Sequence, residues 1–128
     1  MHTVQDVFDR ACAFLFENLG EDTDFRNNVL PLMNVLAAEA LPYENSIRYS
    51  NGEAELKTAP VFRSENDEIP YSDDICAIAL PYGLASFFYQ DEADSYRAHD
   101  YRGRFINALQ EAAKCKEEDI TDVYGGGE

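Results

Sequence analysis

The sequence is poor in the residues from which most active sites are built. Its 128 residues include three cysteines, two histidines and no tryptophan. Nucleophilic catalysis needs a base beside the nucleophile, and neither His2 nor His99 has a recognisable motif around it. Cys12, Cys76 and Cys115 show no CxxC pair and each lies in an apolar stretch. We therefore expect small core residues in a reducing compartment rather than disulfides.

Loops that bind phosphate or metal are also missing. The glycine cluster at 125–127 follows no strand and opens no helix, as a phosphate-binding loop would. The acidic runs 65–68 and 91–94 do not fit a calcium-binding loop, and the second is explained as the acidic start of a helix. The sequence predicts no catalytic, cofactor-binding or metal-binding residue, and hence a protein that is not an enzyme.

Basic residues are scarce. Ten lysines and arginines stand against 25 acidic residues, which gives a net charge of −15. This balance argues against binding the surface of nucleic acid, where basic side chains must replace counterions, and against anionic membranes. It is typical either of a protein kept soluble by self-repulsion or of a surface along which DNA passes without sticking.

Targeting and membrane-spanning segments are not apparent. No apolar run approaches the ~20 residues that cross a bilayer, and the first residues lack the pattern of a signal peptide. We expect a location in the cytoplasm.

Apolar residues recur mainly with helical spacing, which predicts a mainly α fold of four helices. The first is predicted to begin after Thr3, capped together with Asp6, and to stop at Gly20. The second runs from about residue 22 to Pro42. Pro31 is expected to kink it or to delay its start, with a restart near residues 27–28.

Two more helices are predicted in the second half of the chain. One starts at Ser72 or Asp73, bends at Pro81 and runs to Tyr89; it is apolar on nearly all sides, as in a helix buried within a domain or between subunits. The last follows the acidic cap at 91–94. Residues 1–116 are expected to form the helical domain and 117–128 a flexible, acidic, glycine-rich tail.

The central region predicts a β-hairpin or loop insertion. Asn51-Gly52 is the strongest short hairpin signal, since a type I′ turn needs positive φ at both residues. Around this turn Arg48 would face Glu55, an opposite-charge pair. A lone hairpin is marginally stable, so it should lie on the helices or on a neighbouring chain.

Aromatic residues crowd the third predicted helix and the start of the fourth. Core packing explains some of them, but tyrosine and phenylalanine are also enriched at the centres of interfaces. The predicted subunit interface comprises these aromatics and the hairpin turn: Tyr82, Phe87, Tyr89, Tyr96, Asn51 and Gly52.

The second half of the chain contains Asp73-Asp74-Ile75, the run Ala79-Leu80-Pro81-Tyr82-Gly83-Leu84-Ala85, the acidic turn 91–94, and then Tyr96, Tyr101, Phe105 and Leu109. In this series it resembles the C-terminal half of tailed-phage head–tail connector (adaptor) proteins. The order of predicted elements extends it over most of residues 1–115.

This resemblance implies a virion structural protein that forms a ring beneath the portal and bridges capsid to tail. The implied partners are further copies of itself, the portal protein and a tail-completion protein. The implied location is the cytoplasm of a host bacterium during assembly, then the virion. Two alternatives stay open: a small acidic regulator or chaperone of a basic protein, and an accessory subunit of an enzyme.

Overall fold

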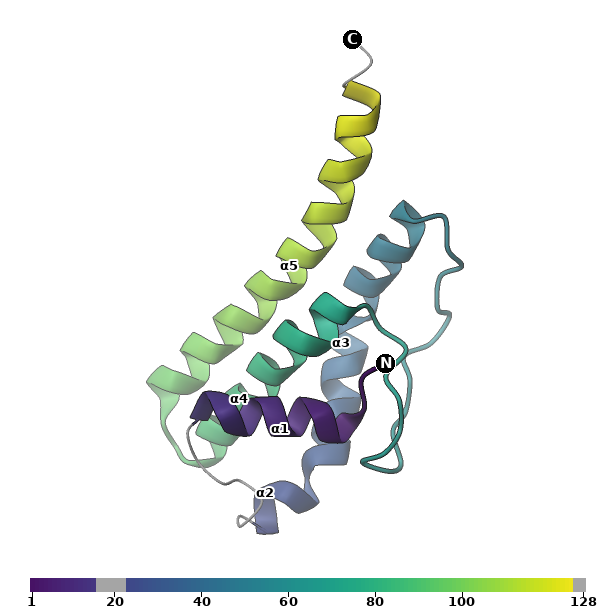
Figure 1. Ribbon diagram of the computed structural model, residues 1–128. Coiled ribbons are helices and arrows are strands. Elements are labelled where there is room, and N and C mark those ends of the chain that lie inside the picture. Colours follow the sequence, from purple (N-terminus) through teal and green to yellow (C-terminus); the bar gives the residue numbers. More distant parts are fainter. Residues whose placement is uncertain (16–22, 126–128) are drawn as a thin grey trace.

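The computed structural model describes the backbone of residues 1–15 and 23–125 and the side chains of residues 1–13 and 25–114. Within that part the fold is helical and contains no strand. The elements are α1 (Val4–Leu15), α2 (Thr23–Asn27), α3 (Val29–Ser50), the π-helical segment η2 (Ile75–Ala79), α4 (Leu80–Asp91) and α5 (Ser95–Gly125). In Figure 1, α5 lies along one side of the molecule and the segment joining α3 to α4 along the opposite side. The predicted mainly α class is confirmed.

Helix α1 begins as its sequence predicts. The Asp6 N–H donates to Thr3 Oγ1 over 3.2 Å, and the Thr3 N–H donates to Asp6 Oδ2 over 3.0 Å. This reciprocal capping box satisfies two backbone donors at the helix start. The bond from the Thr3 N–H also lowers the pKa of the Asp6 carboxyl. The stop predicted at Gly20 lies outside the described residues.

The predicted second helix is both divided and longer than expected. α2 ends at Asn27 and α3 begins at Val29, which confirms the predicted restart. The predicted end at Pro42 is wrong, because α3 continues to Ser50 with Pro42 inside it. Pro42 is exposed, so the group it leaves without a helical bond lies on the solvent side. The turns beyond it are held by burial of Glu44 and Ile47.

The predicted central β-hairpin is wrong, because its first arm is the last turns of α3. The Gly52 N–H donates to the Tyr49 carbonyl and the Glu53 N–H to the Arg48 carbonyl, at 3.1 and 2.8 Å. This is a Schellman stop, which needs a residue of positive φ just past the helix, and Gly52 has φ +72°. A hairpin turn and a helix stop both need that conformation, so the dipeptide alone did not distinguish them.

Residues 53–72, here called the connecting segment, run back along α3 without regular structure. Two asparagines of α3 hold it by bonding to its backbone as another strand would. Asn45 accepts from the Leu56 N–H and donates to the Leu56 carbonyl, at 2.8 and 3.0 Å. Asn34 makes the same pair of bonds to Phe62, at 2.6 and 3.4 Å. The start of the chain closes on this segment through an isolated antiparallel bridge between Thr3 and Glu68.

The bend predicted at Pro81 stays a prediction, and the helix changes type just before this proline. The Leu80 N–H reaches back five residues to the Ile75 carbonyl, as in a π-helix. Pro81 follows directly, in the first turn of α4, and α4 continues the same helical path because Ala79 and Leu80 both have right-handed helical dihedral angles.

The turn from α4 to α5 repeats the Schellman stop with a different residue. The Ala93 N–H donates to the Gln90 carbonyl and the Asp94 N–H to the Tyr89 carbonyl. Ala93 has φ +58°, a conformation that glycine adopts at much lower cost. Asp94 then caps α5 by accepting from the Arg97 N–H at 3.1 Å, which confirms the predicted acidic cap.

Helix α5 continues beyond the predicted end of the helical domain. It includes residues 117–125, which were expected to form a tail, while residues 126–128 lie outside the described part. The flexibility proposed for this end stays a prediction. In Figure 1 the last turns of α5 extend past the other helices.

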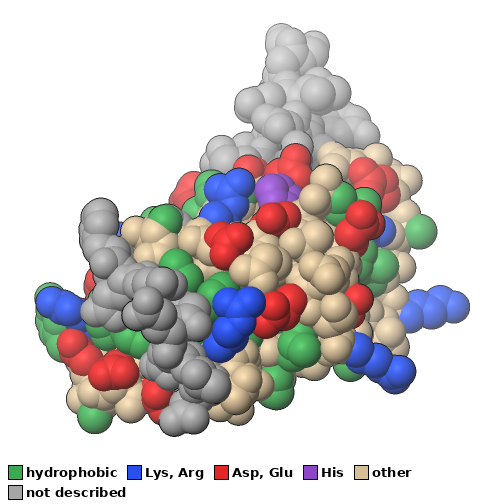
Figure 2. All heavy atoms as spheres, turned by 60° about the horizontal axis from the view of Figure 1, so that its bottom comes forward, with side chains coloured by type: hydrophobic (Ala, Val, Ile, Leu, Met, Phe, Trp, Pro, Cys, Tyr) green, Lys and Arg blue, Asp and Glu red, His purple; other side chains and the backbone are tan. Residues whose placement is uncertain are grey.

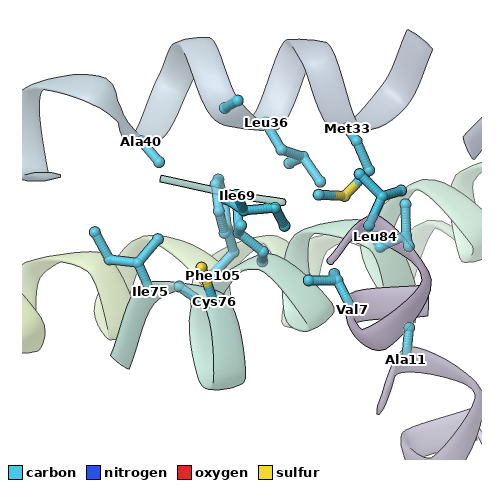
Figure 3. Close-up of a cluster of buried hydrophobic side chains, with 14 of the residues drawn as sticks. Val7, Ala11, Met33, Leu36, Ala40, Ile69, Ile75, Cys76, Leu84 and Phe105 are labelled. Carbon is cyan, nitrogen blue, oxygen red and sulfur yellow. The ribbon is translucent and has the colours of Figure 1, made fainter. Parts of the chain in front are cut away.

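The core lies where α1, α3, α4 and α5 meet. Figure 3 shows side chains of all four helices converging with Ile69 of the connecting segment, among them Val7, Leu36, Leu84 and Phe105. These five side chains are fully buried. Gly83 permits the close approach of α3, since a Cβ there would lie 2.6 Å from Leu36 Cδ2.

Candidate interaction surfaces

A cluster of three tyrosines lies between α4 and α5. Tyr89 stacks on Tyr101 with ring centroids 5.5 Å apart and planes 16° from parallel. The ring centre of Tyr82 lies 6.1 Å from that of Tyr101, with the two planes tilted by 43°. All three are partly buried, so each ring has one side in the protein and another toward solvent.

Two arginines of α5 cover the solvent side of this cluster. The Arg97 guanidinium lies 5.5 Å from the Tyr89 ring centre, and that of Arg104 lies 5.4 Å from the Tyr101 ring centre. Ion pairs with Asp94 at 3.7 Å and with Asp100 at 3.2 Å orient them. Burial raises the pKa of the Tyr101 hydroxyl above its usual range, so the ring stays neutral at physiological pH.

Tyr96 stands beside this cluster as an exposed aromatic residue. Its relative exposure is 84%, in the first turn of α5 next to Arg97. We call Tyr82, Tyr89, Tyr96, Arg97, Tyr101 and Arg104 the tyrosine–arginine edge.

A shallow groove runs along the seam of α3 with α4 and α5. Phe87 and Gln90 line both of its parts. Leu32 lies at one end and Val35 farther along, so the floor is partly apolar. Arg102 and Glu39 form an ion pair across its far part.

A hollow of about 670 Å³ lies between the end of α3, the connecting segment and the start of the chain. Its apolar lining includes Ile47 and Ile69, which are buried, and its acidic lining includes Glu53, Asp73 and Asp74, which are exposed. The end of α3 and the connecting segment, which line it, lie on the side of the molecule away from the first turns of α5 (Figure 1). We call it the acidic hollow.

An ion pair between Glu44 and Arg48 lies at the wall of this hollow. Glu44 is 2% exposed; it accepts from Arg48 Nε at 2.8 Å and from the Ser72 N–H at 2.6 Å. Arg48 also donates to the carbonyls of Ala54 and Pro70, at 3.2 and 2.7 Å. The buried Glu44 carboxylate is thus bonded twice, as burial requires, and with the half-buried Arg48 it fixes both ends of the connecting segment on α3.

The buried thiol near this network is not a nucleophile. Cys76 is fully buried, and burial raises its pKa to about 12. Nucleophilic cysteines depend on the thiolate and on exposure. Burial also raises the pKa of the Tyr71 hydroxyl, which donates to the Ala37 carbonyl at 2.6 Å.

The six residues predicted as one interface lie on separate surfaces of the structure. Tyr82 and Tyr89 both pack on Tyr101, Tyr96 is exposed in the first turn of α5, and Phe87 lies in the groove on α3. Asn51 lines the acidic hollow, and Gly52 ends the helix beside it. Whether any of them contacts another subunit stays a prediction.

Sequence reasoning missed the ionic residues of both surfaces. Glu44 and Arg48 stand four residues apart, a helical ion-pair spacing that a hairpin assignment hid. Arg97 and Arg104 are separated by two helical turns, which places them on one face of α5.

The apolar helix at 75–91 is largely covered by its own chain. Ile75, Leu80, Leu84 and Phe88 are at most 5% exposed, whereas Ile78 is 47% exposed. Its sequence left open whether this helix is buried within the domain or between subunits. Burial within the domain accounts for most of its apolar surface.

Acidic residues do not form a continuous wall on the face that Figure 2 shows. Acidic and basic side chains lie interspersed there with hydrophobic ones. Five arginines of the described part form ion pairs with carboxylates.

The described residues contain no group of three or more His, Cys, Asp or Glu side chains that could hold a metal ion. No helix in the same part of the chain has the length and apolarity needed to cross a membrane. Comparison with known proteins found no matching family model, no matching curated protein and no matching solved structure.

Proposed function

We propose that the chain is a structural subunit of a tailed-phage head–tail connector, a ring beneath the portal that joins capsid to tail. The observation that carries this proposal is α5, whose last turns extend beyond the rest of the fold (Figure 1). We expect this extension to lie against a neighbouring subunit in the assembled ring.

The surface of the described part adds support. Tyr96, Tyr49 and Val61 are 84%, 76% and 69% exposed, and aromatic side chains are enriched at the centres of protein interfaces. The arrangement of helices on either side of an irregular connecting segment also fits the element order that the sequence resemblance implies.

Native mass spectrometry of the full chain, alone and mixed with a tailed-phage portal protein, tests the proposal. We expect a closed ring in at least one of these settings, at micromolar concentration. A single subunit in both settings, with no complex with the portal, would refute it.

The charge of the chain favours a second candidate, an acidic regulator or chaperone of a basic protein. Glu53, Glu55, Asp73 and Asp74 are exposed carboxylates, and electrostatic complementarity would steer a cationic partner toward them. This candidate predicts a monomer or dimer that binds a basic protein with strong salt dependence, and no ring.

A further inference from the structure

The dipeptide that ends α3 contains both groups of an intramolecular reaction. The Asn51 side chain is an amide, and the backbone nitrogen of Gly52 follows it in the chain. When that nitrogen attacks Asn51 Cγ, a C–N bond forms and the Cγ–Nδ2 bond breaks. Ammonia leaves with the proton that the Gly52 nitrogen gives up, and a succinimide ring closes. Water then opens the ring at either carbonyl, which leaves aspartate or isoaspartate in place of the asparagine.

Two features of the structure leave this dipeptide accessible. Asn51 and Gly52 are both exposed, and the Asn51 side-chain amide has no hydrogen bond to any described residue. Gly52 has no side chain to hinder the attack, and the space where its Cβ would stand is open, with nothing within 4 Å.

The backbone of the helix stop opposes the reaction in the folded chain. Asn51 has ψ 0°, which eclipses the Gly52 nitrogen with the Asn51 nitrogen. Ring closure needs the Gly52 nitrogen eclipsed with Cβ, because Cβ carries Cγ. The Gly52 N–H is also bonded to the Tyr49 carbonyl at 3.1 Å. The last turn of α3 must therefore open before the nitrogen reaches Cγ.

A second asparagine of the same helix provides an internal comparison. Asn45 also precedes a small residue, Ser46. Its amide is fixed by the Leu56 backbone, from which it accepts at 2.8 Å and to which it donates at 3.0 Å. Because this amide is held away from its own main chain, the folded protein should distinguish Asn45 from Asn51.

We propose that Asn51 is a site of spontaneous deamidation, at a rate set by opening of the last turn of α3, and that the isoaspartate product loosens the connecting segment. Isoaspartate adds a methylene group to the main chain, which displaces the N–H groups of Gly52 and Glu53 from their carbonyl acceptors. The new carboxylate also lies at the C-terminal end of a helix, which disfavours negative charge. It joins Glu53 in the acidic hollow. This modification depends on the fold of one chain and not on the proposed connector function.

Peptide mapping of the full chain measures the reaction. The protein is incubated at slightly alkaline pH, either folded or unfolded in guanidinium chloride, and is then digested with trypsin. Cleavage after Arg48 and Lys57 isolates Asn51 in the peptide 49–57, separate from Asn45. Chromatography with mass spectrometry quantifies the asparagine, aspartate and isoaspartate forms of each peptide.

We expect Asn51 to react roughly ten- to a hundredfold more slowly in the folded chain than in the unfolded one. Asn45 should stay intact until the chain unfolds. Equal rates at Asn51 in the two states would overturn the control by helix opening. A folded chain in which Asn51 stays intact for as long as Asn45 would overturn the site itself.

Two variants test the consequence of the modification, with circular dichroism to establish that each folds. Asn51→Asp carries the new charge without the extra methylene group, and Asn51→Ser cannot react. After the same incubation, amide hydrogen exchange at Gly52 and Glu53 should be roughly tenfold faster in the modified wild type than in fresh protein. Exchange should change less in Asn51→Asp and not at all in Asn51→Ser. Modified protein that exchanges like fresh protein, or no faster than Asn51→Asp, would overturn the effect ascribed to isoaspartate.

Discussion

The helices and the connecting segment are held in this fold by different kinds of contact. α1, α3, α4 and α5 meet through fully buried apolar side chains (Figure 3). The connecting segment also buries Phe62, Ile69 and Tyr71, but in addition it is bonded to α3 by polar side chains, those of Asn34, Asn45, Glu44 and Arg48. Apolar contacts depend on area and tolerate substitutions of similar volume, whereas these hydrogen bonds depend on single atoms. The packing of the helices should therefore tolerate more substitutions than the hydrogen bonds that hold the connecting segment on α3.

Leu84→Ala tests the helical part and should have the largest effect. Leu84 is fully buried between α4 and its neighbours, so its truncation should lower the free energy of unfolding by about 3 kcal/mol or more. Ile78→Ala, at a residue that is 47% exposed in the preceding turns, is the matched control and should cost less than about 1 kcal/mol. Urea denaturation measures both, and equal losses would contradict the described core.

Glu44→Ala tests the ionic support of the connecting segment. It leaves Arg48 and the Ser72 N–H without their buried acceptor, for an expected loss of about 2–3 kcal/mol. Glu53→Ala is the control, because Glu53 is exposed, and it should change stability by less than about 0.5 kcal/mol. If Glu44→Ala behaved like this control in chemical denaturation, the buried network would not hold the segment.

Asn34→Ala and Asn45→Ala should each cost about 1–2 kcal/mol, since each leaves two backbone groups of the connecting segment without their partners. The effect should be local. Amide hydrogen exchange at Phe62 should accelerate in the Asn34 variant and exchange at Leu56 in the Asn45 variant, with α4 little changed. Uniform acceleration over the whole chain would show that segment and helices open together.

The smallest effects are expected at the two helix stops. Ala93→Gly should stabilise the protein by up to about 1 kcal/mol because it relieves the positive φ of Ala93. Gly52→Ala should destabilise it by about 1 kcal/mol for the converse reason. Thermal melts should therefore move in opposite directions, and shifts of the same sign would contradict the shared geometry.

Features set by neighbouring residues could be predicted from the sequence. The capping box of Thr3 and Asp6, the cap at Asp94 and the apolar faces of the helices each depend on residues a few positions apart. The prediction of a hairpin was wrong because Asn51-Gly52 suits both a hairpin turn and the end of a helix. Contacts between Glu44 and Ser72, and between Ile47 and the core, decided between them.

The remaining features depend on pairs that are distant in the chain. Asn34 and Phe62 are 28 residues apart and Asn45 and Leu56 are 11 apart, so no short window shows either pair. The tyrosines were recognised by type, but their stacking and their cover of arginines required the packing of α4 on α5. The separation of the predicted interface onto two sides followed from the same packing.

Photo-cross-linking from position 96 tests the proposed assembly most directly. Replacing Tyr96 by the photoreactive aromatic residue p-benzoylphenylalanine preserves an exposed aromatic side chain. After irradiation of the assembled protein, mass spectrometry should find links between copies of the chain. A complete absence of links between copies would contradict self-assembly through the start of α5.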